Sequence, residues 1–244
     1  MAARPTRRGK AWREARQRYD RMREHEPAEA VALVKQLREP KFDEAVELHV
    51  RTGLNVRHAE EQLRGTIALP NGLGRDVTVV VFAQGDKAKE AEEAGADVVG
   101  TDDLAKRIEE GFSDFDVVIA SPDMMPVVGR LGKVLGPSGK MPNPKVGTVT
   151  ADIAKAVSEA KAGKVEYRTD KSGIVHLVIG RIGFEESDLV ENFNAVMEEI
   201  NRARPAAAKG RYITSVTLAS TMGPGVRVET QTTKESPEEA TAAV

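Results

Sequence analysis

Apolar and polar residues alternate in short stretches near both ends of the chain. Val46, Leu48 and Val50 are each followed by a polar residue, and this period of two is typical of a strand with one buried face. Comparable patterns predict five more strands, at residues 67–69, 164–168, 174–179, 211–219 and 226–228. Residues 169–173 end in a glycine and predict a hairpin turn between two of these strands. The two ends of the chain therefore favour one antiparallel sheet.

Apolar residues at helical spacing predict three helices in the same parts of the chain. They are residues 7–25, a helix that begins at Pro27 and is stopped by Pro40, and residues 187–204. The first is rich in arginine and carries Trp12, Tyr19 and Met22 towards one side. Packing on the body of the protein and contact with RNA are equally compatible with this pattern.

The middle of the chain has a different pattern. Residues 77–82 are almost continuously apolar, which is typical of a strand covered on both faces. Two helix patterns, at residues 86–94 and 102–110, then alternate with two strand patterns, at residues 97–99 and 116–120. This order predicts a small βαβ domain with a parallel sheet. Thr150 is expected to cap a further helix that runs to Gly163, with Asp152 in its first turn.

These patterns indicate a mixed α/β protein of two domains. Residues 1–71 and 164–244 would form a discontinuous α+β domain with an antiparallel sheet, and residues 72–163 an inserted Rossmann-like βαβ domain with a parallel sheet. Gly72, Gly74 and Gly163 lie where the chain crosses between the two, so we expect a hinge there.

Residues 121–150 fit neither a helical nor a strand period. They contain five glycines and five prolines, which predict a fixed backbone shape without regular secondary structure. The net charge of the segment is +3, from four cations and one acid: Arg130, Lys133, Lys140, Lys145 and Asp123. The segment follows the third strand of the predicted parallel sheet, where ligand-contacting loops lie. It is therefore a candidate binding surface.

Composition narrows the class of protein. The 244 residues include no cysteine, which excludes disulfides and thiolate metal sites and favours a cytoplasmic protein. No apolar run is long enough to span a membrane. The net charge of −2 conceals an uneven distribution, with +6 over residues 1–24, −7 over residues 86–116 and −3 over residues 229–244. Such asymmetry suggests one surface for a polyanion and another kept away from it.

Motifs for catalysis and nucleotide binding are missing. Residues 136–141 contain Gly-Pro-Ser-Gly-Lys, which is too short for a P-loop and lacks a hydroxyl after the lysine, and no Gly-x-Gly-x-x-Gly follows a predicted strand. The four histidines lack zinc spacing, and Ser121 and Ser138 lack the setting of a hydrolase nucleophile. We expect no enzyme, no metal and no cofactor. A small α/β protein that binds a nucleotide through the glycine-rich segment stays as the alternative.

RNA chemistry fits the remaining residues. Hydroxyl groups, exposed apolar faces and glycines suit ribose, bases and a closely approaching backbone, and they cluster at Ser215, Thr217, Thr221, Met222 and Gly223. Phe42, next to Lys41, adds an aromatic face. Composition alone favours the core for Phe42 and Met222. A scaffold that contacts only protein is a third alternative.

Several motifs, in order along residues 28–228, resemble the ribosomal protein L1 family. They are Lys41-Phe42-Asp43-Glu44, Arg64-Gly65-Thr66, Leu69-Pro70-Asn71-Gly72, the segment LGKVLGPSGKMPNPKVGTVT at residues 131–150, Lys161-Ala162-Gly163-Lys164, residues 167–173 and Thr221-Met222-Gly223-Pro224. The long segment is the most specific of them. Asn71 stands where many members have histidine, which leaves the hinge assignment intact.

The resemblance implies a protein of the ribosomal stalk that binds large-subunit rRNA and assists release of deacylated tRNA from the exit site. It also implies translational repression through the protein's own mRNA, and a monomer when free of the cytoplasmic ribosome. The expected RNA contacts are Lys41, Phe42, Asp170, Lys171, Ser215, Thr217, Thr221, Met222 and Gly223. This reverses the preference for the core at Phe42 and Met222. Arg130, Lys133, Lys140 and Lys145 become a secondary RNA or interdomain surface, and the two chain termini receive no role.

Overall fold

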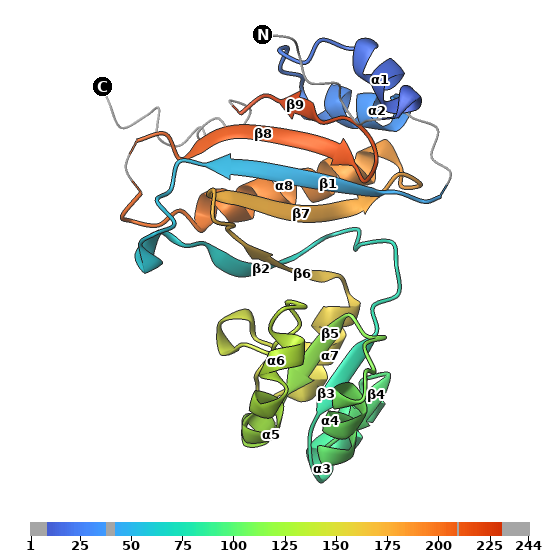
Figure 1. The fold of residues 1–244 in the computed structure, drawn as a ribbon, viewed down its shortest axis with the longest axis vertical. Coiled ribbons are helices and arrows are strands. Elements are labelled where there is room, and N and C mark those ends of the chain that lie inside the picture. Colours follow the sequence, from blue (N-terminus) through green and yellow to red (C-terminus); the bar gives the residue numbers. More distant parts are fainter. Residues whose placement is uncertain (1–8, 38–41, 209, 231–244) are drawn as a thin grey trace, which may run out of the picture. The chain divides into compact units, whose positions relative to one another are not determined.

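The computed structural model describes residues 9–37, 42–208 and 210–230. They fold into two compact units (Figure 1): one from the chain ends, up to Leu63 and from Tyr167 onwards, and one from residues 64–166. The domain boundaries expected at residues 72 and 163 stay a prediction. The mixed α/β class, with an antiparallel and a parallel sheet, is confirmed.

The first unit is built on a four-stranded antiparallel sheet in the order β7-β1-β8-β9 (Figure 1). Its strands are β1 (Ala45–Thr52), β7 (Ile174–Arg181), β8 (Ile213–Ser220) and β9 (Val226–Val228). Its helices are α1 (Lys10–Gln17), α2 (Pro27–Gln36) and α8 (Glu186–Arg202), with a short 3-10 turn η1 (Ala59–Glu61). Helices α2 and α8 contact each other and the sheet.

Alternation along the strands decides which face is buried. Val46, Leu48 and Val50 of β1 are buried, as are Val216 and Leu218 of β8. The residues between them point to the opposite side and stay partly or fully exposed, and we call this side the outer face: Glu47, His49, Arg51, Ser215 and Thr217. The period of two in the sequence therefore predicted both the strands and their two faces.

Three local predictions for the chain ends and turns are wrong. The basic helix ends at Gln17 and does not continue to residue 25. The strand at residues 164–168 does not pair with β7 as a hairpin, because β6 (Lys164–Arg168) pairs with β2 (Arg64–Ala68) and β7 pairs with β1. The predicted turn itself forms, because the Asp170 N–H donates to the Ile174 carbonyl at 2.8 Å and a single antiparallel bridge joins Thr169 to Val175. Asp152, not Thr150, caps helix α7 (Ile153–Lys161), because its carboxylate accepts a hydrogen bond from the Lys155 N–H at 3.2 Å.

The second unit contains the predicted βαβ arrangement. Its elements are β3 (Val79–Phe82), α3 (Asp86–Glu93), β4 (Val98–Gly100), α4 (Asp102–Glu109) and β5 (Val117–Ala120). The strands are parallel, in the order β4-β3-β5. All four residues of β3 are buried, two against α3 and α7 and two against the opposite layer. The apolar run at residues 77–82 is therefore continuous because both faces of β3 are covered, as expected.

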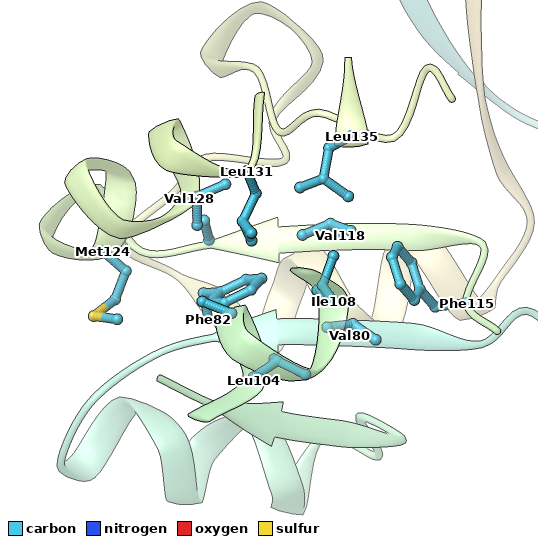
Figure 2. Close-up of a cluster of buried hydrophobic side chains, with 12 residues drawn as sticks. Val80, Phe82, Leu104, Ile108, Phe115, Val118, Met124, Val128, Leu131 and Leu135 are labelled. Carbon is cyan, nitrogen blue, oxygen red and sulfur yellow. The ribbon is translucent and has the colours of Figure 1, made fainter. Parts of the chain in front are cut away.

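Residues 121–150 contain regular structure, which corrects the prediction of an irregular loop. They form η2 (Pro122–Met124), α5 (Met125–Arg130), α6 (Gly132–Leu135) and η3 (Pro144–Val146). Their apolar residues pack on Phe82 and Val118 of the sheet (Figure 2), and these are Met124, Val128, Leu131 and Leu135. The spacing of four, three and four residues is helical. Pro126 is tolerated because it lies in the first turn of α5, where no intrahelical donor is needed.

Candidate nucleic-acid interface

The segment Thr221–Gly223 follows β8 and is fixed to the start of β1. The Thr221 N–H donates to the Ala45 carbonyl at 3.1 Å, and the Ala45 N–H donates to Thr221 Oγ1 at 3.1 Å. The Thr221 hydroxyl in turn lies 3.3 Å from the Ala45 carbonyl. These reciprocal contacts hold the backbone of the segment at the end of β8, beside the start of β1, while the Thr221 side chain stays exposed.

A buried carboxylate supports the next residue. Glu44 is 0% exposed, and its Oε2 accepts a hydrogen bond from the Met222 N–H at 3.1 Å. Gly223 donates to Ser220 Oγ at 3.0 Å, and a Cβ at this position would lie 2.4 Å from the same oxygen. A side chain at residue 223 would therefore displace the Ser220 hydroxyl and disturb this hydrogen bond. A fixed backbone with little freedom to rearrange is what a pre-organised binding surface needs.

Two large apolar side chains project from this region. Met222 is 51% exposed and Phe42, two residues before Glu44, is 54% exposed. The interpretation of these side chains as core residues is therefore wrong. Lys41, which precedes Phe42 and was also predicted to contact RNA, lies outside the described residues. Exposed aromatic and thioether groups can stack on or pack against unpaired bases.

Polar residues of the outer face continue from this region across the sheet. Register places Ser215 opposite Arg51 and Thr217 opposite His49, and His49 is also paired with His176 of β7. Ser215 and Thr217 are partly exposed, as expected for RNA contacts. Sequence reasoning missed His49 as the neighbour of Thr217, Arg51 as the neighbour of Ser215, and His176 as the residue on the other side of His49. Their position in the alternating strand pattern already predicted the outer face, but the cross-strand register was not available from one sequence.

The two histidines form a close pair. His49 Nδ1 lies 2.9 Å from His176 Nδ1, with the rings edge to face and their centroids 5.0 Å apart. His49 Nε2 lies 3.6 Å from Glu47, and His176 Nε2 lies 3.5 Å from Asp170. Burial lowers the pKa of His49 below its usual value, and the neighbouring His176 lowers it further, with Glu47 opposing both effects.

Asp170 organises the turn between β6 and β7. Its Oδ1 accepts hydrogen bonds from the N–H groups of Ser172 and Ile174, each at 2.8 Å. The Ile174 N–H is the main cause of the lowered pKa of Asp170, with the Ser172 N–H and His176 adding to it. Lys171 at the tip is exposed. The structure thus assigns the carboxylate a role in shaping the turn and leaves the lysine open to solvent.

A groove beside this turn gathers further cations. It is lined by Val56, Arg57, Gln62, Arg168, Thr169, Asp170 and Lys171. The three basic side chains in it are exposed. Arg57 and Arg168 were missed by sequence reasoning because they are far apart in the chain and each lies in an unremarkable local pattern.

The cations of the second unit differ from one another. Arg130 and Lys133 are exposed. Lys140 Nζ donates to the carbonyls of Ser113 at 3.2 Å and Phe115 at 2.5 Å, and lies 4.7 Å from the Phe115 ring centroid, so it tethers its own unit. The side chain of Lys145 lies outside what the structure describes.

The predicted hinge glycines share an unusual backbone. Gly72, Gly74 and Gly163 have φ values of 63°, 68° and 94°, which L side chains rarely adopt. A Cβ on Gly163 would lie 2.8 Å from Gly72 Cα. Glycine is therefore required at this close approach, whatever motion the segment undergoes.

Within the described residues, no group of three or more His, Cys, Asp or Glu side chains could hold a metal ion. No helix in this part of the chain is both long and apolar enough to cross a membrane. The site described here offers hydrogen-bonding groups, cations and two apolar side chains on a fixed backbone.

These features define an α/β protein of two units whose candidate site is a surface suited to a large polyanion. The chain belongs to the ribosomal protein L1 family: the model of the Ribosomal protein L1p/L10e family matches residues 33–224. It is similar to the large ribosomal subunit protein uL1 of Thermobifida fusca (strain YX), with 52% identity over 229 residues that cover 94% of this chain and 97% of that protein. The resemblance found in the motifs is confirmed, and membership of this family agrees with the expectation of a protein without catalytic activity.

Proposed function

We propose that this chain is a component of the large ribosomal subunit and binds its rRNA through the first unit. The observation that carries the proposal is the segment Thr221–Gly223, fixed by Glu44 and Ala45, from which Met222 projects into solvent. A monomer with a rigid surface of this kind loses little conformational entropy on binding. The relative in Thermobifida fusca, whose name places it in the large subunit, supports the same function.

Each part of the surface has a chemical counterpart in RNA. Phe42 and Met222 supply apolar faces for bases or ribose, and Ser215 and Thr217 supply hydroxyls for the 2′-OH. Lys171 supplies a cation for phosphate at the other end of the outer face, with Asp170 holding its turn in shape. A recognition surface that joins stacking groups, hydroxyls and cations suits a folded RNA better than a nucleotide.

Two further roles follow from the same surface. We propose that the chain assists release of deacylated tRNA from the exit site, with Arg130 and Lys133 of the second unit as its contacts. We also propose that it represses translation of its own mRNA. A messenger that folds like the rRNA site would occupy the same groups, so rRNA and mRNA would compete for one surface.

The proposal is tested by titrating the full chain with the stalk fragment of large-subunit rRNA. A scrambled RNA of equal length serves as the control for charge alone. We expect the stalk fragment to bind at least about a hundred times more tightly at physiological salt. Equal affinity for both RNAs, together with saturable nucleotide binding in calorimetry, would replace this function with nucleotide binding.

A further inference from the structure

The basic segment at the N-terminus is attached beside the candidate interface. The Tyr19 hydroxyl donates to the Gly225 carbonyl at 2.7 Å. Further along, the His25 N–H donates to the Arg227 carbonyl at 3.1 Å, and the Glu229 N–H donates to the His25 carbonyl at 2.9 Å. Residues 19–25 therefore run along β9 and lead to the turn that contains Gly223. This segment is anchored by contacts across the whole length of the chain.

Most cations in this segment have no acidic partner. Residues 10–23 contain six Lys or Arg and two acids. Lys10 pairs with Glu14 at 3.8 Å and Arg23 with Glu29 at 3.2 Å. Arg13, Arg18 and Arg21 are exposed, and no carboxylate among the described residues forms an ion pair with them. Arg18 and Arg21 thus lie within two residues of the anchored Tyr19, and all three arginines are exposed to solvent.

An exposed apolar side chain stands among these arginines. Met22 is 69% exposed, more than Phe42 or Met222 and more than any other exposed large hydrophobic side chain of the described residues. A side chain of this kind between Arg21 and Arg23 repeats the combination of apolar and cationic groups seen at the main site. Burial of an exposed methionine by a partner would remove this apolar surface from water.

We propose that residues 10–23 form a further RNA-contacting surface, in which Arg13, Arg18 and Arg21 bind phosphates of the RNA held at Thr221–Gly223. The inference rests on the proposed function, because it extends the same site. RNA is favoured over an acidic protein or an anionic membrane because the segment adjoins the proposed RNA site: the Tyr19 hydroxyl bonds to Gly225, two residues from Gly223. The tyrosine acts as a positioning residue, since its hydroxyl holds the arginines beside the site.

The test uses the full chain, the stalk rRNA fragment and a triple variant, Arg13→Gln with Arg18→Gln and Arg21→Gln. A matched control removes three exposed lysines of the second unit: Lys89→Gln with Lys106→Gln and Lys155→Gln. We expect the first variant to bind the RNA at least about ten times more weakly. The slope of log affinity against log salt concentration should become less negative by roughly two to three, because each lost phosphate contact contributes about 0.9 to this slope. The control should stay within about twofold of the wild type.

A third variant, Tyr19→Phe, keeps every charge and removes only the hydroxyl. We expect it to weaken binding severalfold while its melting temperature and circular dichroism stay close to those of the wild type. A photo-crosslinker at residue 22 should attach to the RNA, and one at residue 134 serves as its comparison.

The outcomes separate the two proposals. If the wild type fails to bind the stalk fragment, the proposed function falls and this inference with it. If the wild type binds but the arginine and lysine variants lose affinity equally, or neither loses any, the inference alone is overturned. Crosslinking of residue 22 to a protein or a vesicle of anionic lipid, without any crosslink to RNA, would also overturn it.

Discussion

His49 Nδ1 lies 2.9 Å from His176 Nδ1, across β1 and β7 on the outer face of the sheet. A hydrogen bond between two such nitrogens requires one to carry a hydrogen and the other to be bare, so at least one of the rings is neutral. Glu47 and Asp170 flank the pair. On the neighbouring strands, Arg51 lies opposite Ser215 and Arg227 lies opposite Thr217. A proton on both Nδ1 atoms would break this hydrogen bond, so protonation of the pair is linked to the contact between β1 and β7 at these residues.

This pair predicts a loss of stability below neutral pH. The pKa of His49 is lowered in the folded protein from its usual 6.5, mainly by burial, so the unfolded chain binds more protons as the pH falls below about 6.5. Stability from this group is complete above pH 6.5 and is lost as the pH falls towards the folded pKa. The lowered pKa of Asp170 reduces stability only as the pH approaches its usual 3.8, which is below the range from pH 7.5 to 5 used to test His49.

The measurement is the melting temperature of the wild type and of His49→Gln between pH 7.5 and 5. We expect the wild type to lose more stability over this range than the variant. His58→Gln, at an exposed histidine of the same unit, serves as the control and should follow the wild type. Identical pH profiles for the wild type and His49→Gln would contradict the prediction.

Glu44 is predicted to control the shape of the RNA surface from beneath. Its carboxylate accepts the Met222 N–H, and Glu44→Ala would leave this donor without that acceptor and open a cavity. We expect a cost of about 1–3 kcal/mol in the free energy of unfolding, measured with urea, and weaker RNA binding under conditions where the variant is folded. Glu47→Ala, on the outer face, should change stability by less than about 0.5 kcal/mol. Equal effects of the two substitutions would show that Glu44 has no special role.

Any side chain at residue 163 is predicted to destabilise the second unit. Gly163→Ala would place a Cβ 2.8 Å from Gly72 Cα at a φ of 94°, and we expect a cost of about 1–3 kcal/mol. Gly129→Ala is the matched control, because it lies in α5 with no atom within 4 Å of an added Cβ, and alanine there should stabilise the helix by about 0.5–1 kcal/mol. Hydrogen exchange of β3 and β5 measures both. Destabilisation of similar size by the two substitutions would mean that the φ at residue 163 is not the cause.

The sequence predicted the elements that depend on local pattern. Val46, Leu48 and Val50 identified β1 and its buried face, and the apolar run at residues 77–82 identified a strand covered on both sides. The helices in residues 121–150 were missed because their glycines and prolines concealed the helical spacing of Met124, Val128 and Leu131. The low helix propensity of glycine and proline was outweighed there by the burial of apolar side chains against the sheet.

Other features depend on partners that are distant in sequence. The basic helix ends at Gln17, and Tyr19 beyond it bonds to Gly225, 206 residues away. Similarly, β6 pairs with the distant strand β2, whereas the sequence pattern predicted that it would pair with its neighbour β7. Exposure of Phe42 and Met222 was expected from the family resemblance and not from composition, since an apolar residue type favours burial.

RNA binding at Thr221–Gly223 can be tested with a single substitution at Met222. Met222→Ala removes an exposed side chain, so it should leave the melting temperature unchanged. It should weaken binding of the stalk rRNA fragment by roughly tenfold or more, as expected when the RNA no longer buries a methionine side chain, a burial worth about 1.5–3 kcal/mol. Val134→Ala removes a comparably exposed apolar side chain, 44% exposed, from the second unit and should have no such effect. If Met222→Ala binds the fragment as tightly as the wild type does, Met222 makes no contact with the RNA and the proposed site at Thr221–Gly223 is wrong.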